Sequence, residues 1–429
     1  MKKTLLAALS LMLVAVIALT MAACGEKEAE IKGPTKDVSI YKSGSGFDTV
    51  NDPLSWEAIN KFPVVHDGMT IEEGKDLVVD FFRYCKTAVW MPDNSYDYKI
   101  KEANTESEHI EGYVKYGGLP YISLGSGNIY RLMDFMDPET AVVNMEAAGL
   151  KPKLFGNQCS FGSYVGAGRA INSAKYSWTK GMTPLNGFVP VGDYSIRNDV
   201  QNFSNGGYST ITVMEENGPE VMYEAYAGLK KGDSIVYFTT AGHVVMISED
   251  AVVTRTADGK VDPAQSYVLV IDQTPGHSEM TNAAGDSFAY EKNVDAKWTF
   301  QKLFQGKYVP YTFKEWLGQD PLESSKTTFS HTGETISLRE LNGSIVESNY
   351  GVMDIYASIY NAKGVEVYKL AVRATETAVN SLKFQTASPN ADIWGSEENI
   401  YADQEYTVKI YAQISTGERP TLWEGKLAQ

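Results

Sequence analysis

The sequence predicts an α+β protein in which two folded units follow an export signal. Thr70 and Glu73 form a capping-box pattern, which marks the start of a helix. Apolar residues then follow at helical spacing: Leu77, Val78, Phe81, Phe82 and Cys85. Strand-like runs at 234–248 and 267–271 predict a sheet in the same unit. From about residue 326 only short alternating stretches occur between turns, which predicts a separate all-β unit.

The first residues have the pattern of a lipoprotein signal peptide. Two lysines precede an apolar run that extends from Leu5 to Leu19. Met21-Ala22-Ala23-Cys24 then resembles a lipobox, the signal for cleavage and acylation, although Met21 stands where Leu is usual. We therefore expect residues 1–23 to be removed, Cys24 to carry lipid at the outer side of the bacterial cell membrane, and 24–40 to be a polar tether. The alternatives are a plain secretory signal and an uncleaved membrane anchor.

Composition limits the classes of function. The chain has 429 residues and a net charge of −16, which argues against binding of nucleic acid or anionic lipid by bulk charge. With only three cysteines, an exported protein of this length is not a disulfide scaffold. Cys85 lies on the apolar stripe of its helix, so a buried thiol is expected there, with a disulfide to Cys159 as the alternative.

The domain boundaries are placed where the pattern of apolar and turn residues changes along the sequence. Residues 41–325 contain a helical stretch at 138–149, a Gly-, Pro- and Asn-rich loop at 181–209, and an aromatic cluster at 297–318 that closes this unit. Residues 326–429 contain about seven short strands, which suggests a β-sandwich of immunoglobulin-like kind. The predicted strands include Thr335 to Leu338, Met353 to Tyr360, Val365 to Val372, Ser381 to Phe384, Glu405 to Gln413 and Leu422 to Lys426.

Cys159 is the first candidate catalytic residue. Phe161, Tyr164 and Val165 keep helical spacing after it, and Asn157 can cap this helix and so place Cys159 in the first turn. There the helix dipole and the free backbone N–H groups favour a thiolate and could stabilise an oxyanion. The glycines of this helix weaken it, and are useful only where another element packs very closely.

A second segment supplies a base for this thiol. The runs on either side of Ala241-Gly242 predict a hairpin with His243 at the start of its returning strand. A third strand runs into Asp272 and Gln273, and either residue could fix the tautomer of the imidazole. Successive residues of a strand point to opposite faces, so only one of the two can face His243.

The order of these residues resembles the NlpC/P60 family, papain-like cysteine peptidases of bacterial cell walls. The matching segments cover about residues 70–280: Gly118-Leu119-Pro120-Tyr121, Cys159-Ser160-Phe161-Gly162, Gly232-Asp233, His243-Val244 and Asp272-Gln273. The resemblance implies a Cys-bearing helix packed on an antiparallel sheet, and cleavage of amide bonds in peptidoglycan stem peptides. It assigns Cys159 as nucleophile, His243 as base, Asp272 or Gln273 as orienting residue, and Tyr121 and Ser160 as substrate-binding residues. The sequence departs from the family in Gln158 before the cysteine and in a long insertion at 172–230.

Two other functions remain open at this point. A transglutaminase-like enzyme would also use Cys, His and Asp, and Val270-Ile271-Asp272-Gln273-Thr274 resembles that family's motif. A cell-surface binding lipoprotein with an inactive papain-like domain is the non-catalytic alternative. We expect no cofactor and no metal site, because no spacing typical of metal ligands occurs. The expected partners are peptidoglycan peptides and, through the lipid, the membrane; nucleic acid is not expected, and the oligomeric state does not follow from the sequence.

Overall fold

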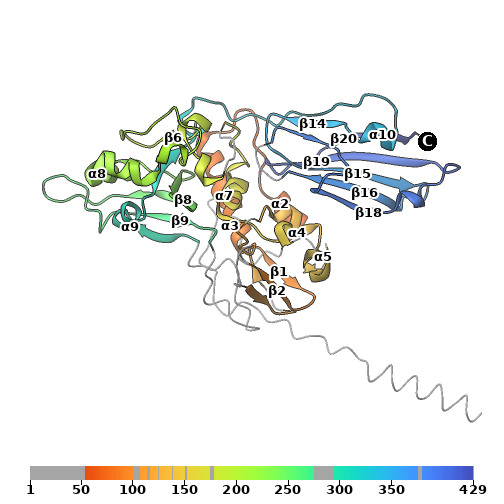
Figure 1. Cartoon of the computed structure of the whole chain (residues 1–429), viewed down its shortest axis with the longest axis horizontal. Helices are drawn as coiled ribbons and strands as arrows, with labels where there is room; N and C mark the ends of the chain where they lie inside the picture. Colours follow the sequence, from red (N-terminus) through yellow and green to blue (C-terminus); the bar gives the residue numbers. More distant parts are fainter. Residues whose placement is uncertain are drawn as a thin grey trace, which may run out of the picture.

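A computed structural model describes residues 54–99, 107–113, 116–123, 125–137, 139–149, 152–173, 178–274, 294–374 and 379–428. The expected signal peptide, Cys24 and the tether lie outside these ranges. Helices and mainly antiparallel sheets alternate along the chain, which confirms the α+β class at this level (Figure 1). Within the described part, no helix combines the length and apolarity needed to span a bilayer.

The first elements lead to the cysteine helix. They are α2 (Trp56–Asn60), α3 (Ile71–Thr87), β1 (Val89–Pro92), β2 (Tyr96–Lys99), β3 (Ser107–Ile110), β4 (Tyr116–Gly117), α4 (Ile129–Met133), β5 (Val142–Val143), α5 (Met145–Gly149), α6 (Pro152–Phe155) and α7 (Cys159–Ala167). Helix α3 begins with the predicted capping box of Thr70 and Glu73, and its apolar stripe is buried. The helix predicted at 138–149 is wrong in its first half: 142–143 pairs with β1 as strand β5, and only α5 is helical.

The remaining elements of this part build a six-stranded sheet. They are η1 (Thr179–Gly181), η2 (Pro184–Asn186), β6 (Val189–Pro190), η3 (Asn205–Gly207), α8 (Thr210–Ala227), β7 (Ser234–Phe238), β8 (Gly242–Val252), β9 (Tyr267–Ile271), β10 (Ala296–Thr299), α9 (Phe300–Gln305), β11 (Val309–Thr312) and η5 (Glu315–Leu317). The strands lie in the order β10-β9-β8-β7-β11-β6, with every neighbouring pair antiparallel. The predicted hairpin and third strand are therefore confirmed, and α7 and α3 lie beside the sheet at the centre of the molecule (Figure 1).

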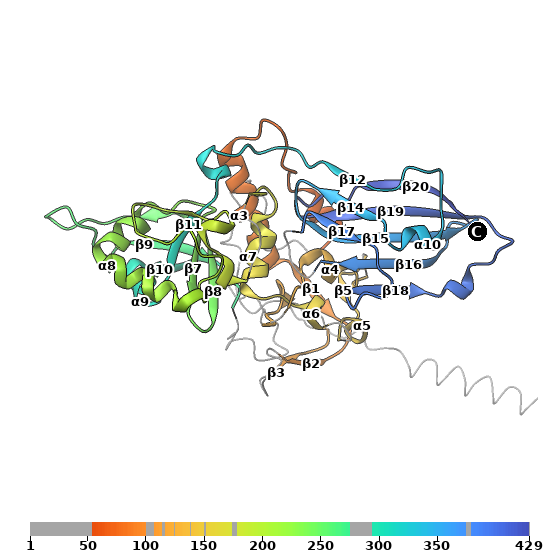
Figure 2. The same cartoon turned by 45° about the horizontal axis from the view of Figure 1, so that its top comes forward.

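The described residues after 326 form sheets of their own. The elements are β12 (Thr327–Phe329), β13 (Thr335–Ile336), α10 (Leu338–Leu341), β14 (Ile345–Ser348), β15 (Val352–Asn361), β16 (Glu366–Arg373), β17 (Ser381–Lys383), β18 (Ala391–Gly395), η6 (Glu397–Asn399), β19 (Tyr406–Ile414) and β20 (Thr421–Leu427). One sheet has the order β13-β20-β19-β15-β16-β18 and the other β12-β14-β17. They touch through β14 against β15, β15 against β17 and β12 against β20. Figure 2 shows these strands together on the side of the molecule away from α8.

Buried ion pairs join the C-terminal strands to α4. The Arg131 guanidinium lies 2.8 Å from the Asp354 carboxylate, and both side chains have no exposed surface. Arg131 also donates to the backbone carbonyls of Met353 and Ala374, at 2.9 Å and 2.7 Å. Arg373 of β16 pairs in turn with Asp134, which follows α4, at 2.7 Å. Arg131 and Asp134 therefore each pair across the two parts, whereas Arg373 also pairs with Asp392 within the C-terminal part.

Candidate active site

Cys159 is the first residue of α7 and is 5% exposed. The sequence analysis named Asn157 as the cap of this helix, and this is wrong: Gln158 occupies the N-cap position, without a side-chain capping bond. The backbone of Asn157 instead bridges Tyr121 and Ser126, which holds it one residue too early to cap. Cys159 still lies in the first turn, where the backbone N–H groups have no partner within the helix.

Close packing explains two of the glycines in α7. A Cβ atom on Gly166 would lie 2.6 Å from Cβ of Phe82 on α3 and 3.3 Å from Cε of Met246 on β8. A Cβ atom on Gly162 would lie 3.2 Å from Cβ and Cγ of Gln273. Any larger residue would push α7 away from these neighbours, so the glycines allow the cysteine helix to lie directly against α3 and the sheet.

His243 links Cys159 to the third residue. It is the second residue of β8 and is paired with Tyr237 across the hairpin. Its Nε2 atom lies 2.7 Å from Oδ1 of Asp272, and its side chain hydrogen-bonds Cys159. With Nε2 engaged by Asp272, Nδ1 is the ring nitrogen left to interact with the thiol. The structure thus brings Cys159, His243 and Asp272 together from α7, β8 and the end of β9.

The electrostatics of this group favour an imidazolium. Burial of the imidazole lowers its pKa, but the charges of Asp272 and Cys159 and their hydrogen bonds oppose this, and the pKa of His243 lies well above its usual value. The His243 and Asp272 side chains are only 19% and 8% exposed, so water screens their interaction weakly.

Gln273 follows β9 and forms its side-chain hydrogen bonds with residues other than His243. Its Oε1 atom accepts a hydrogen bond of 2.6 Å from Nζ of Lys86, and its Nε2 atom donates to the carbonyl of Leu119 at 3.2 Å. Of the two candidate orienting residues, Asp272 is therefore the one that contacts His243.

The two expected substrate-binding residues differ in position. Tyr121 is partly buried and close enough to Cys159 and Asp272 that, with burial as the larger cause, their negative charges raise the pKa of its phenol. Ser160 is only 1% exposed. Tyr121 can thus border a bound substrate, whereas the burial of Ser160 does not fit the expectation that it lines a cleft.

Tyr308 lies beside the site, although the sequence did not predict it as a site residue. Its ring stands edge-on to His243, with centroids 6.4 Å apart, and also packs against Trp298 at 5.5 Å. Burial and the charges of Asp272 and Cys159 raise the pKa of its phenol. The sequence predicted only that the aromatic cluster at 297–318 closes its unit, and nothing in its spacing connected it with a cysteine some 150 residues earlier.

Cys85 is chemically distinct from Cys159. Both cysteines carry free thiols, and Cys85 is 3% exposed. Burial raises the pKa of the Cys85 thiol to about 12, so it stays protonated at neutral pH. The expected buried thiol is found, and the alternative disulfide is not formed.

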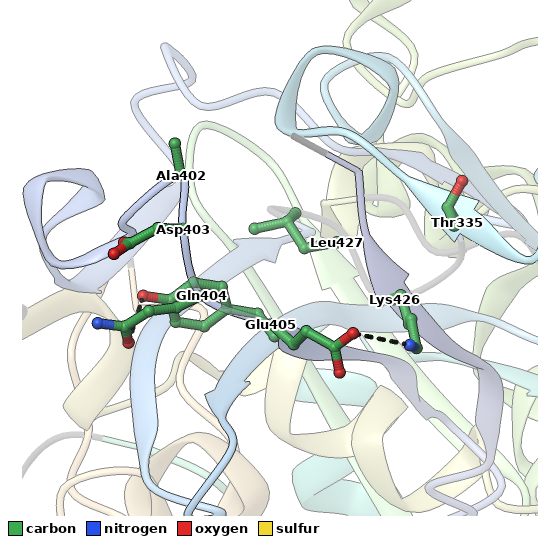
Figure 3. Close-up of a pocket in the computed structure, with 8 residues that line it drawn as sticks. Thr335, Ala402, Asp403, Gln404, Glu405, Lys426 and Leu427 are labelled. Carbon is green, nitrogen blue, oxygen red and sulfur yellow. Dashed lines mark hydrogen bonds and ion pairs between the residues drawn. The ribbon is translucent and has the colours of Figure 1, made fainter.

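A cavity in the C-terminal part lies apart from this site. It has a volume of about 300 Å³ and is lined by Thr335, Ala402, Asp403, Gln404, Glu405, Tyr406, Lys426 and Leu427 (Figure 3). Glu405 reaches toward Lys426, and the two charged groups pair at 3.2 Å. Within the described ranges, no three His, Cys, Asp or Glu side chains are grouped so as to hold a metal ion.

Comparison with known proteins adds no family to these observations. No model of a protein family matches the chain, and no curated protein matches it.

Proposed function

We propose that the protein is a cysteine hydrolase of NlpC/P60 type that cleaves amide bonds in peptidoglycan stem peptides. One observation carries the proposal: His243 lies between the carboxylate of Asp272 and the thiol of Cys159, which begins a helix. A nucleophile, a base and an orienting group in contact are the parts that acyl transfer to a thiol requires.

The proposed reaction has two steps, acylation of Cys159 and hydrolysis of the resulting thioester. The Cys159 thiolate attacks the amide carbonyl, and backbone N–H groups of the first turn of α7 bind the oxyanion. The imidazolium of His243 gives its proton to the leaving amine, and an acyl-enzyme remains. His243 then takes a proton from water, whose oxygen attacks the thioester and releases the carboxylic acid and Cys159. Asp272 stabilises the imidazolium throughout.

The arrangement of helices and sheets supports our assignment of two domains. A helix bearing the cysteine against an antiparallel sheet is the papain-like arrangement, so we assign residues 41–325 to such a domain with an N-terminal extension. We assign 326–429 to an immunoglobulin-like sandwich, on the strength of its two contacting sheets. The stem-peptide substrate rests on the motif order and on the expected export signal.

Mass spectrometry of digested peptidoglycan tests this function. The protein without residues 1–24 should release peptides with a new amino terminus and a new carboxyl terminus, and Cys159→Ala should release none, because the thiol is the nucleophile. If the wild-type protein binds wall peptides but leaves them uncleaved, the result would instead support a binding lipoprotein with an inactive papain-like domain.

A transglutaminase-like enzyme is the second candidate, and the contact between Asp272 and His243 favours it, because that family also uses Cys, His and Asp. The same experiment separates the two. With an added primary amine, a transferase would give products that carry the amine, whereas a hydrolase would give free carboxylic acids.

We also propose that the chain is held at the cell membrane by lipid on Cys24. Cys24→Ala should remove the acylation site, so the variant should lose metabolic labelling with a fatty acid and should leave the membrane fraction. Ser10→Ala in the same apolar run is the matched control and should keep both properties. Lipid-modified Cys24→Ala protein in the membrane fraction would contradict the assignment.

A further inference from the structure

Lys86 is a buried lysine beside the candidate active site. It lies in the last turn of α3 and is 1% exposed. Lysine is almost never fully buried unless its ammonium is paired, because leaving water is costly for a charge. Its Nζ atom donates a hydrogen bond of 2.6 Å to Oε1 of Gln273. The buried ammonium is therefore bound to the residue that follows Asp272.

Gln273 connects Lys86 to the elements that build the site. Its Nε2 atom donates to the carbonyl of Leu119, two residues before Tyr121. Its Cβ and Cγ atoms fill the space left by Gly162 on the cysteine helix. One amide side chain therefore joins α3, the end of β9, α7 and the segment that carries Tyr121.

The charge of Asp272 also acts on Lys86. Burial lowers the pKa of Lys86 to about 8, and the negative charge of Asp272 opposes this effect. The other titratable group that acts on it is Cys85, which stays neutral because burial raises its thiol pKa to about 12. Asp272 thus contacts His243 directly, and its charge also acts on the buried ammonium of Lys86.

We propose that Lys86 is a positioning residue of the Cys159–His243–Asp272 site, which fixes the end of β9 through Gln273 so that Asp272 faces His243. Gln273 follows Asp272 directly in the segment after β9, so fixing the Gln273 side chain limits the movement of the backbone that carries Asp272. Without the ammonium, Oε1 of Gln273 is buried and loses this donor, and the strand end relaxes to satisfy it. The inference rests on the proposed thiol chemistry, but not on the identity of the substrate.

Alkylation of Cys159 by iodoacetamide, followed by mass spectrometry between pH 5 and pH 9.5, tests this role without a substrate. In the wild type, Cys159 should be alkylated at pH 6. In Lys86→Met, Asp272 no longer holds His243 as firmly against the thiol, so the alkylation rate at pH 6 should fall at least about tenfold relative to the wild type. Cys85 in the same sample should stay unlabelled and reports that the core is folded.

Three variants complete the design. Lys75→Met is the matched control, since Lys75 is also a buried lysine of α3, at 8% exposure, but pairs with Glu72 at 3.3 Å; its alkylation profile should equal that of the wild type. Gln273→Leu should reproduce the loss seen in Lys86→Met. The double variant should lose no more than either single variant, because the two residues act through one contact. Replacing both partners with apolar groups also protects the fold against an unpaired buried group.

The outcomes separate this inference from the proposed function. An unchanged alkylation profile in Lys86→Met, or additive losses in the double variant, would overturn the positioning role. A wild-type Cys159 that reacts as a thiolate while wall peptides stay intact would remove the substrate and leave the role of Lys86 standing. A wild-type Cys159 that titrates as an ordinary thiol would overturn both, since no ion pair would exist to be positioned.

Discussion

Cys159→Ala and His243→Ala are each expected to lower turnover of stem peptides by about 10⁴-fold or more. The thiol forms the covalent intermediate, and the imidazole both pairs with the thiolate and protonates the leaving amine. Because the two groups act as one unit, the double variant should be no slower than either single variant. Rates of product release, measured by chromatography on a purified stem peptide, check the expectation.

Cys85→Ala is the matched control for the nucleophile. Cys85 is the other described cysteine, and it is buried and protonated at neutral pH, so its loss should leave the rate within about twofold. Asp272→Ala should cost more than Gln273→Ala, because only Asp272 contacts the imidazole directly. Full activity in Cys159→Ala would contradict the covalent mechanism. A larger loss of activity in Gln273→Ala than in Asp272→Ala would show that the orienting residue is misassigned.

The second large effect is expected on stability, at the contact between α4 and the C-terminal strands. Arg131→Met removes the guanidinium that pairs with Asp354, and it leaves a carboxylate of 0% exposure with Arg373 at 3.8 Å as its nearest remaining cation. Breaking a buried ion pair from one side costs about 3–5 kcal/mol, since the remaining charge stays out of water. Urea unfolding followed by tryptophan fluorescence measures the change in the free energy of unfolding.

An exposed ion pair of the same C-terminal part provides the comparison. Lys409 and Glu424 pair at 3.3 Å, but their side chains are 43% and 50% exposed. Lys409→Met should therefore change the free energy of unfolding by less than about 1 kcal/mol. Equal effects of Arg131→Met and Lys409→Met would mean that water reaches the α4 contact.

Local patterns in the sequence predicted the parts of the fold that depend on neighbouring residues. The capping box at Thr70, the hairpin before His243 and the strand at 267–271 are all confirmed. The sequence also predicted that only one of Asp272 and Gln273 would face His243; the two do have different partners, but both lie after the end of β9, so strand alternation is not the reason.

Long-range contacts could not be predicted in this way. Lys86 and Gln273 are 187 positions apart, and an apolar stripe with a lysine at its end is typical of any amphipathic helix. Tyr308 reaches His243 only because β11 and β8 lie on either side of β7 in the sheet. Strand β18 and helix α8 were missed as well. Pro219 and Gly218 interrupt the helical pattern of α8, where Gly218 adopts a φ of 73°.

The ion pair of Arg131 has a consequence for the order in which the chain folds. Asp354 lies 223 residues after Arg131, so this contact joins segments that are far apart in the chain. Until β15 has formed, burial of α4 would leave the Arg131 guanidinium without the Asp354 carboxylate. Docking of α4 should therefore accompany formation of β15, which couples the folding of the two parts.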